Sequence, residues 1–207
     1  MKKLEGHNST VNIVRFSPDG QTIASVSEDG TIKLWSLDGK KLQTIESPGV
    51  LDLAFSPDSK TLSVVSRDNT LKIWKIDGIL LTTSNYIALS APLVAYFSAD
   101  GKLLAAFDQW NRVQFWNIED NQIKQLKYLS LPTLTISRFS ADAKTIALVS
   151  KDNVVKLVGL ESETWDIPEE KQMKNSNIVG LSPDNFPVSL DNNQLKFWNS
   201  DGTVKKF

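Results

Sequence analysis

The sequence lacks the side chains on which many catalytic and metal centres depend. Its 207 residues include no cysteine and a single histidine, His7. Without cysteine there is no disulfide, no thiolate nucleophile and no thiolate zinc site, and one histidine leaves almost no material for imidazole metal sites or His-dependent catalytic triads. We therefore expect no catalytic residue, no metal and no cofactor, and a protein that is not an enzyme.

The chain also lacks an excess of charge of one sign and a long hydrophobic run. Lys and Arg total 23 against 24 Asp and Glu, and no basic stretch resembles the one that nucleic-acid binding requires. The longest apolar stretch, residues 87–97, is interrupted by Ser90 and Pro92 and is shorter than the ~20 residues of a membrane helix. The beginning of the chain has no apolar signal-peptide segment. These features predict a cytoplasmic protein that binds neither nucleic acid nor membrane.

An internal repeat is the strongest feature of the sequence. The phrase Phe-Ser-Pro-Asp-Gly at residues 16–20 returns in close variants about 40 residues apart, at 55–59, 97–101, 139–143 and 181–185. A second phrase keeps the same period and ends at Trp35, Trp74, Trp116, Val158 and Trp198. We expect a single domain over residues 1–207 made of five units, at approximately 1–39, 40–78, 79–121, 122–162 and 163–207.

Each unit has the pattern of four short strands. In the first unit, alternating or apolar runs predict strands at 11–16, 21–27, 31–36 and 40–45, separated by turns rich in Pro, Gly and Asp. A four-stranded sheet with two apolar faces is not stable alone and must pack against a copy of itself. The sequence therefore predicts an all-β fold, a β-propeller of five four-stranded antiparallel blades.

The candidate outer strands exceed the number of units by one. Candidates at 40–45, 79–83, 122–128, 163–167 and 203–207 supply five blades, and residues 2–5 resemble a sixth. Either one terminal strand closes a ring, or the chain was cut from a longer repeat array and forms an open arc. Closure is favoured because an open arc would expose two apolar blade faces. A closed ring predicts a monomer, and an open arc predicts self-association.

The chain resembles the WD-repeat β-propeller family over essentially all of its length. The first unit carries the fullest set of family residues: Gly6, His7, the phrase at 16–20, Ser25, Asp29 and Trp35. The resemblance implies a structural hydrogen-bond chain that runs from the Trp35 indole through Ser25 and His7 to Asp29. Such a chain satisfies buried polar groups. We therefore prefer a structural role for His7 over a catalytic or metal-binding one.

The later units depart from this pattern. Counted position for position, Val64 replaces the serine in the second repeat, Ala106 in the third, Leu148 in the fourth and Val188 in the fifth. The third repeat also has Trp110 in place of the turn aspartate. We expect these four units to be held together mainly by apolar packing.

The resemblance implies that one rim of the propeller is a docking platform for a protein or peptide partner. By analogy the rim candidates are Thr10, Asn12, Glu28, Leu51, Arg67, Leu93, Gln109, Trp110, Thr135, Lys151, Asn177 and Asp191. Leu51, Arg67, Leu93 and Trp110 combine residue types that binding hot spots favour, so we single them out as a binding patch. The alternative is that the two leucines pack inside their blades and that Trp110 fills a groove.

Three functions fit the sequence unequally. The preferred one is a non-catalytic protein-interaction scaffold. The second is a sensor or regulatory repeat segment detached from a larger signalling protein, suggested by the surplus strand at residues 2–5. The third is a propeller hydrolase or lactonase, which requires acidic side chains or a metal converging on the central channel. The acidic residues at 119–120 and 161–170 are better explained as solvated faces.

Overall fold

Strands make up the regular structure of the described residues, and no helix occurs among them. The computed structural model describes residues 3–85, 92–108, 110, 112–119, 122–130, 134–139, 145–150, 154–159, 171–172, 177–182, 187–191, 194–198 and 203–205. Within these ranges there is no helix that is both long and apolar enough to cross a membrane. The predicted all-β class is confirmed.

The chain divides into two compact units, which are considered separately. Unit 1 comprises Met1–Phe97 and Gly101–Leu129, and unit 2 comprises Ser98–Asp100 and Ser130–Phe207. The single domain, the closed ring and the count of five blades stay predictions.

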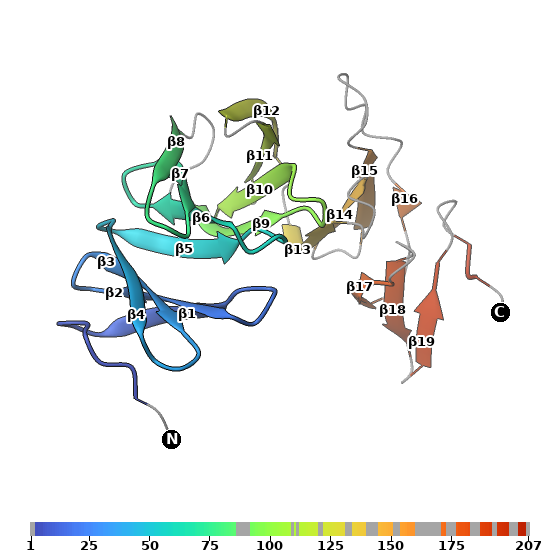
Figure 1. The fold of residues 1–207 in the computed structure, drawn as a ribbon. Helices are drawn as coiled ribbons and strands as arrows, with labels where there is room; N and C mark the ends of the chain where they lie inside the picture. The colour runs from blue at the N-terminus through green and yellow to red at the C-terminus, as the bar shows by residue number, and fades with distance from the viewer. Residues whose placement is uncertain are drawn as a thin grey trace. The chain divides into compact units, whose positions relative to one another are not determined.

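Unit 1 holds three sheets, each with four antiparallel strands in chain order (Figure 1). The first contains β1 (Val11–Phe16), β2 (Thr22–Ser27), β3 (Thr31–Ser36) and β4 (Lys41–Glu46). The second contains β5 (Val50–Phe55), β6 (Thr61–Ser66), β7 (Thr70–Lys75) and β8 (Leu80–Asn85). The third contains β9 (Pro92–Phe97), β10 (Leu103–Asp108), β11 (Arg112–Glu119) and β12 (Gln122–Ser130). The outer strands β4, β8 and β12 begin within one residue of the predicted ranges.

The repeated five-residue phrase forms the turn between the first two strands of a sheet. The Ser17 hydroxyl donates to Asp19 Oδ1 at 2.5 Å and accepts from the Thr22 amide at 2.9 Å. Ser56 makes the equivalent bonds, to Asp58 at 2.6 Å and from the Thr61 amide at 3.0 Å. These side-chain bonds substitute for the backbone partners that a tight turn cannot supply. The recurrence of the phrase therefore reflects a recurring turn.

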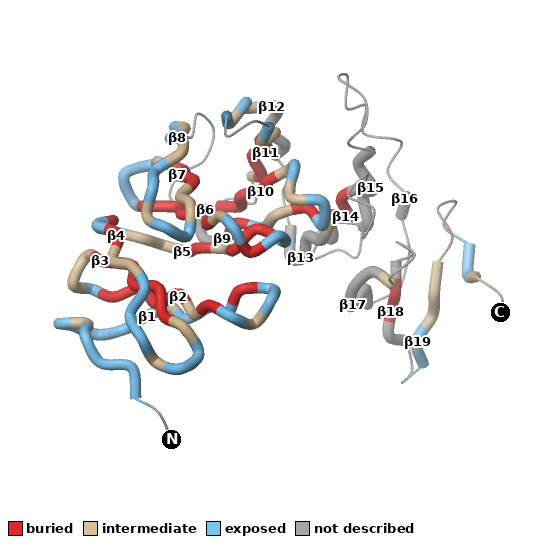
Figure 2. The backbone as a smooth tube through the Cα atoms, viewed as in Figure 1, coloured by how far each residue is buried: buried red, intermediate tan, exposed pale blue. Residues whose placement is uncertain are grey.

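The three sheets of unit 1 pack face to face through two apolar cores. The core between the first and second sheets includes Leu34 and Leu62, both fully buried. The core between the second and third includes Leu71 and Trp116, also fully buried. Figure 2 shows that the buried residues are concentrated in the two middle strands of each sheet of unit 1. The second sheet therefore has an apolar core against each of its two faces, as stacking of repeated sheets requires.

Unit 2 contains a four-stranded and a three-stranded antiparallel sheet. The first has β13 (Leu134–Phe139), β14 (Thr145–Ser150), β15 (Val154–Gly159) and β16 (Lys171–Gln172). The second has β17 (Asn177–Leu181), β18 (Pro187–Asp191) and β19 (Gln194–Phe197), followed by an isolated bridge between Trp198 and Val204.

Two expectations about outer strands need comment. The strand that pairs with β15 is Lys171–Gln172, whereas the predicted range 163–167 lies outside the described residues. At the start of the chain, residues 3–10 form no strand, so the segment at 2–5 is not an outer strand over its described part. The four-stranded antiparallel pattern is nevertheless the one that the repeat predicts.

Candidate functional site

The first sheet contains a continuous chain of hydrogen bonds among four predicted residues. Trp35 Nε1 donates to Ser25 Oγ at 2.8 Å, and Ser25 Oγ lies 2.7 Å from His7 Nε2. His7 Nδ1 lies 2.9 Å from Asp29 Oδ2. The bonds are all satisfied when Nδ1 carries the proton of a neutral imidazole, because each group then donates to the next. His7 thus ties the segment before β1 to β2, β3 and the turn between them.

Asp29 is the terminal acceptor of this chain. Burial opposes its ionisation, but hydrogen bonds from the Thr31 hydroxyl, the Asn8 amide, the His7 ring and the Thr31 amide outweigh burial. Together they hold the pKa of Asp29 well below its ordinary value. The carboxylate therefore stays ionised at neutral pH, and it stabilises the fold through these hydrogen bonds.

The Trp–Ser hydrogen bond of this chain recurs in the last sheet, contrary to the position-for-position count. Trp198 Nε1 donates to Ser189 Oγ at 2.7 Å, and Ser189 is fully buried. Ser189 pairs with Lys196 as Ser25 pairs with Lys33, so Ser189, and not Val188, occupies the serine position. The count was wrong because the turn between β18 and β19 is one residue shorter than the turn between β2 and β3.

The rim candidates of the first two sheets lie at one end of unit 1. At the opposite end, the turns that follow β1 and β5 touch, because the Asp19 amide donates to Ser59 Oγ at 3.1 Å. The β2–β3 and β6–β7 turns therefore share the end that also carries the starts of β1 and β5. There the Glu28 amide donates to the Thr10 carbonyl, and the Arg67 amide donates to the Gly49 carbonyl, each at 2.9 Å.

The side chains at this end are polar and exposed in the first two sheets. Asn12 Nδ2 donates to Glu28 Oε1 at 3.4 Å, and both residues are exposed. Arg67 is exposed, and its stem lies against Gly49, whose φ of +71° suits glycine. We call the surface made by Thr10, Asn12, Glu28, Arg67 and Trp110 the rim surface.

Trp110 lies on the turn between β10 and β11, which is stabilised by Asp108, a residue that the sequence analysis did not single out. Asp108 Oδ1 accepts the amides of Trp110 and Arg112, each at 2.9 Å. The Arg112 guanidinium holds the other oxygen, with Nη2 at 2.6 Å, and the Asp108 side chain is fully buried. Asp108 thus bonds the amide two residues on, as Ser27 does with Asp29. Trp110 itself is 60% exposed, so it fills no groove among the described residues.

The structure does not bring the whole predicted patch together at the surface. Leu51 is half-buried and packs against the core that contains Val65 and Leu71. The backbones of Leu93, Thr135, Asn177 and Asp191 lie in β9, β13, β17 and β18, but their side chains are outside the description, as are Gln109 and Lys151 altogether. Arg67 and Trp110 are the members of the patch that are described and exposed.

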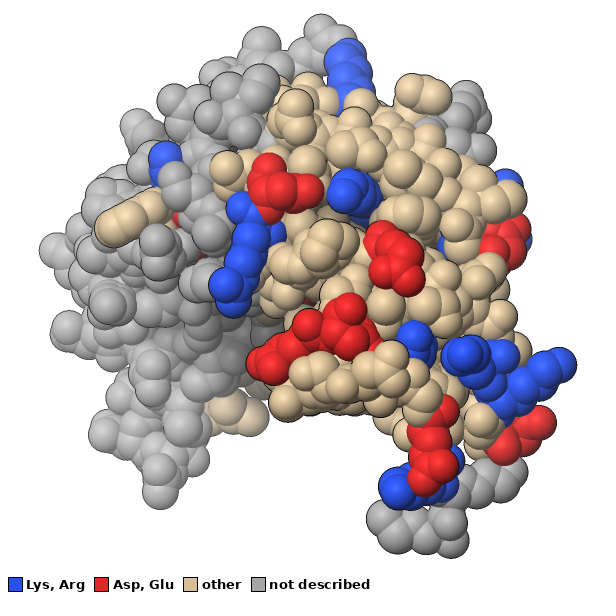
Figure 3. Space-filling view, turned by 90° about the vertical axis from the view of Figure 1, so that its left-hand side faces the viewer, with Lys and Arg blue, Asp and Glu red and all other residues tan. Residues whose placement is uncertain are grey.

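Charges of both signs are interspersed over the described face in Figure 3, without a patch of one sign. In the described part of the chain, no group of three or more Asp, Glu or His is arranged to hold a metal ion. Sequence reasoning also missed Asp52, a buried carboxylate in β5 that is paired with Arg15. Their separation of 37 residues in sequence left no local signal.

Four-stranded antiparallel sheets, the recurring Ser–Asp turn and the Trp–Ser–His–Asp hydrogen-bond chain of the first sheet are the features of WD repeats. Residues 1–36 and 39–75 match the family model described as WD domain, G-beta repeat, so this part of the chain consists of two WD repeats.

Curated proteins with similar sequences match over short segments. The small ribosomal subunit protein RACK1y of Oryza sativa subsp. japonica is 48% identical over 50 residues, which are 24% of this chain and 15% of the relative. The nucleoporin Nup37 of Mus musculus is 44% identical over 52 residues, 24% of this chain and 16% of its own. The human serine-threonine kinase receptor-associated protein is 51% identical over 35 residues, 17% of this chain and 10% of its own. The chain therefore spans less than a fifth of each of these relatives.

Proposed function

We propose that this protein is a non-catalytic interaction module whose rim surface binds a protein partner, with Trp110 and Arg67 as the principal contacts. The observation that carries the proposal is the exposure of Trp110 on a turn held by the buried Asp108. A large aromatic side chain kept in water costs free energy unless a partner covers it. Trp and Arg are also the residue types most enriched among binding hot spots.

The presentation of Trp110 favours binding because little order has to be gained. The two backbone amides bonded to Asp108 and the Arg112 ion pair fix the turn before a partner arrives. Preorganised side chains lose less conformational entropy on association. On the neighbouring sheet, the Arg67 stem rests on Gly49, which limits its freedom in the same way.

The printed names of the relatives support a role in assemblies. One is a protein of the small ribosomal subunit, one is a nucleoporin, and one is associated with a kinase receptor. Each of these names describes a protein that works with other macromolecules. We infer a protein partner for this chain as well, in an intracellular setting.

The test compares partner retention by Trp110→Ala, Arg67→Glu and a matched control. Ile79→Ala removes another exposed apolar side chain, 54% exposed, next to the β7–β8 turn at the opposite end of its sheet. Affinity purification from the cells that make the protein should recover a partner with wild type and Ile79→Ala. We expect that partner to be lost or depleted at least about tenfold with the two rim variants.

Near-UV circular dichroism of each variant shows whether the fold is intact. A folded Trp110→Ala variant that keeps every partner of the wild type contradicts the proposal. Unfolding of Trp110→Ala contradicts it too, because it would mean that Trp110 supports the core and is not a contact residue.

A further inference from the structure

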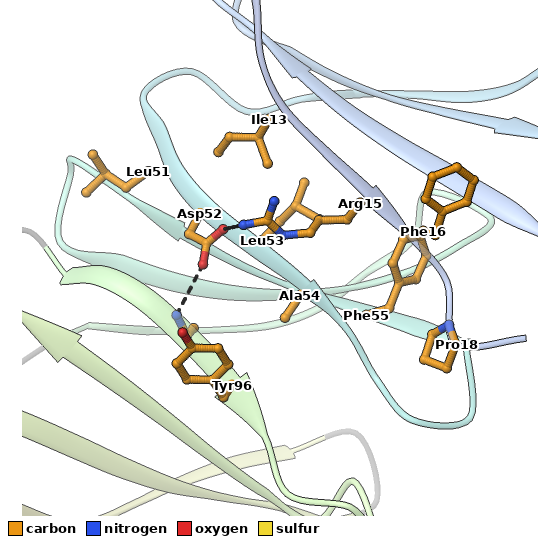
Figure 4. A pocket seen from close by; sticks show the side chains of 11 residues that line it. Ile13, Arg15, Phe16, Pro18, Leu51, Asp52, Leu53, Ala54, Phe55 and Tyr96 are labelled. Carbon is orange, nitrogen blue, oxygen red and sulfur yellow. Dashed lines mark hydrogen bonds and ion pairs between the residues drawn. The ribbon is translucent and has the colours of Figure 1, made fainter. Parts of the chain in front are cut away.

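The inner strands of unit 1 line a cavity of about 370 Å³ that the rim surface does not include. β1, β5 and β9 contribute its walls, and Figure 4 shows the charged pair Arg15 and Asp52 between apolar side chains on both sides. Phe16, Pro18 and Phe55 gather at one end in this view. The cavity is at the small end of ligand pockets, which measure about 300–1,000 Å³.

Asp52 is a positioning group in this cavity and not a free anion. Its side chain is only 8% exposed, and Oδ1 accepts from Arg15 Nη2 at 3.0 Å. Oδ2 accepts from the amide of Ala95, on the next sheet, at 3.4 Å. Because both oxygens have donors, a cationic ligand would have to displace Arg15. Asp52 therefore holds Arg15 in place from behind.

Arg15 is the accessible charge of the cavity. Its side chain is 51% exposed, and besides Asp52 its guanidinium donates to the Val14 carbonyl, from Nη1 at 3.2 Å. A guanidinium has five N–H donors in a planar fork that suits carboxylates. The two bonds named here use only part of that capacity. The remaining donors favour an anionic group over a cationic or a neutral one.

The walls beside Arg15 favour an apolar body attached to that anion. Phe16 is 64% exposed and Tyr96 is 41% exposed, on opposite sides of the charged pair. Tyr96 is held by its tilted contact with Phe107, with ring centroids 6.2 Å apart. Burying such rings under a ligand is favourable in proportion to the area removed from water.

We propose that this cavity binds a carboxylate carried on an aromatic or aliphatic body, with Arg15 as the anion-binding group and Phe16 and Tyr96 as the apolar walls. An acidic side chain beside a large apolar one in a partner protein has this chemistry, and so does a small free acid. The site is separate from Trp110, so the failure of either proposal leaves the other standing.

The test uses two probes, the peptide Ac-Leu-Glu-Phe-NH2 and 3-phenylpropionate. Ala54 and Ala95 both line the cavity, so their ¹³C-methyl NMR signals report binding there, while Ala24, in the core between the first two sheets, serves as an internal control. We expect either probe to shift the two cavity methyls saturably and to leave Ala24 unmoved. The uncharged peptide Ac-Leu-Gln-Phe-NH2 should bind at least about tenfold more weakly, because it cannot form a charge-assisted bond to Arg15.

Variants separate this site from general charge effects. The double variant Arg15→Met/Asp52→Asn removes both charges without stranding a buried carboxylate, and Tyr96→Ala removes one wall. Both should weaken binding of the acidic probes by about tenfold or more. Lys40→Met removes an exposed positive charge that does not line the cavity and should leave binding unchanged.

The two probes also distinguish the source of the ligand. Tighter binding of the peptide indicates a segment of a partner protein, and equal or tighter binding of 3-phenylpropionate indicates a small free acid. Either result supports the site. Absence of saturable shifts at Ala54 and Ala95, or equal affinity of the acidic and uncharged peptides, overturns it. Undiminished affinity of a folded double variant overturns it as well.

Discussion

Trp35 Nε1 and Ser25 Oγ are joined by a 2.8 Å hydrogen bond that crosses from β3 to β2, and Ser25 is in turn the neighbour of His7. The equivalent indole in the second sheet, Trp74, has its nitrogen buried without a partner among the described residues, because Val64 stands where the serine would be. The first two sheets of unit 1 thus share a backbone pattern, but among the described residues the indole N–H is hydrogen-bonded in the first sheet and has no partner in the second.

Loss of the Ser25 hydroxyl should destabilise the protein more than loss of another buried hydroxyl. Ser25→Ala removes the acceptor of Trp35 and the neighbour of His7 Nε2, so two buried polar groups lose their partner. We expect a decrease of about 1–3 kcal/mol in the free energy of unfolding. Ser63→Ala is the matched control, since Ser63 is fully buried but makes only a 3.4 Å bond to the Ala54 carbonyl. Denaturant unfolding measures both, and equal losses would contradict the assigned role of Ser25.

A hydroxyl introduced at position 64 should accept a hydrogen bond from the Trp74 indole N–H. In Val64→Thr the new Oγ can accept from Trp74 Nε1, so part of the usual cost of burying a hydroxyl is recovered. Val65→Thr is the control, because Val65 is equally buried but belongs to the other core. We expect Val64→Thr to be less destabilising than Val65→Thr by about 1 kcal/mol in denaturant unfolding.

A double-mutant cycle shows whether that difference comes from the indole nitrogen. Trp74→Phe removes the donor, so in this background the advantage of Val64→Thr over Val65→Thr should disappear. An advantage that survives Trp74→Phe would mean that Thr at position 64 is satisfied in another way.

The low pKa of Asp29 predicts acid sensitivity of the first sheet. The pKa is lower in the folded than in the unfolded protein, so ionised Asp29 stabilises the fold above its ordinary value of about 3.9. This contribution is lost as the pH falls from there through the folded pKa. In Asp29→Asn the free energy of unfolding should be lower at pH 7 and should fall less between pH 5 and pH 2. Glu46→Gln, at an exposed residue, should keep the wild-type slope.

Asp52 should behave in the opposite sense. Burial raises its pKa against the bonds from the Leu53 amide and Arg15, so Asp52 stabilises the fold most below its unfolded pKa, and this contribution is lost as the pH rises through the folded one. Arg15→Met alone leaves the carboxylate without its cation and should cost about 1–2 kcal/mol at pH 7, since Arg15 is half exposed.

The double variant Arg15→Met/Asp52→Asn should recover most of that loss, because it removes the buried carboxylate together with the cation on which that carboxylate depends. Thermal unfolding of the three proteins at pH 7 measures the recovery. A double variant less stable than Arg15→Met would contradict the assignment of Asp52 as a buried charge that depends on Arg15.

Much of unit 1 could be predicted from the sequence, since its elements are encoded locally. The alternation in residues 11–16 and 31–36 gives β1 and β3 with the predicted bounds. The turn phrase at 16–20 is readable because Ser17 bonds only to near neighbours in sequence, to Asp19 two residues on and to Thr22 five residues on. The residues of the His7 chain were named on the family resemblance, and in the structure they lie within hydrogen-bond distance.

Other contacts had no local signal. Asp108 serves the β10–β11 turn from a position two residues before the one where an aspartate was sought, because its side chain bonds forward to two amides. Ser189 was missed because counting without a gap cannot register a shortened turn. The pair Arg15 and Asp52 joins different sheets and depends on how those sheets pack.

Photo-crosslinking from the rim surface tests the central proposal most directly. The full chain carrying p-benzoylphenylalanine in place of Trp110 is irradiated in the cells that make it, and the same crosslinker in place of Ile79 reports the opposite end of a sheet. The account predicts one or more discrete protein adducts from position 110, competed by unlabelled wild type and not by Arg67→Glu, and none of these from position 79. The same adducts from both positions, or no protein adduct from position 110, would contradict it.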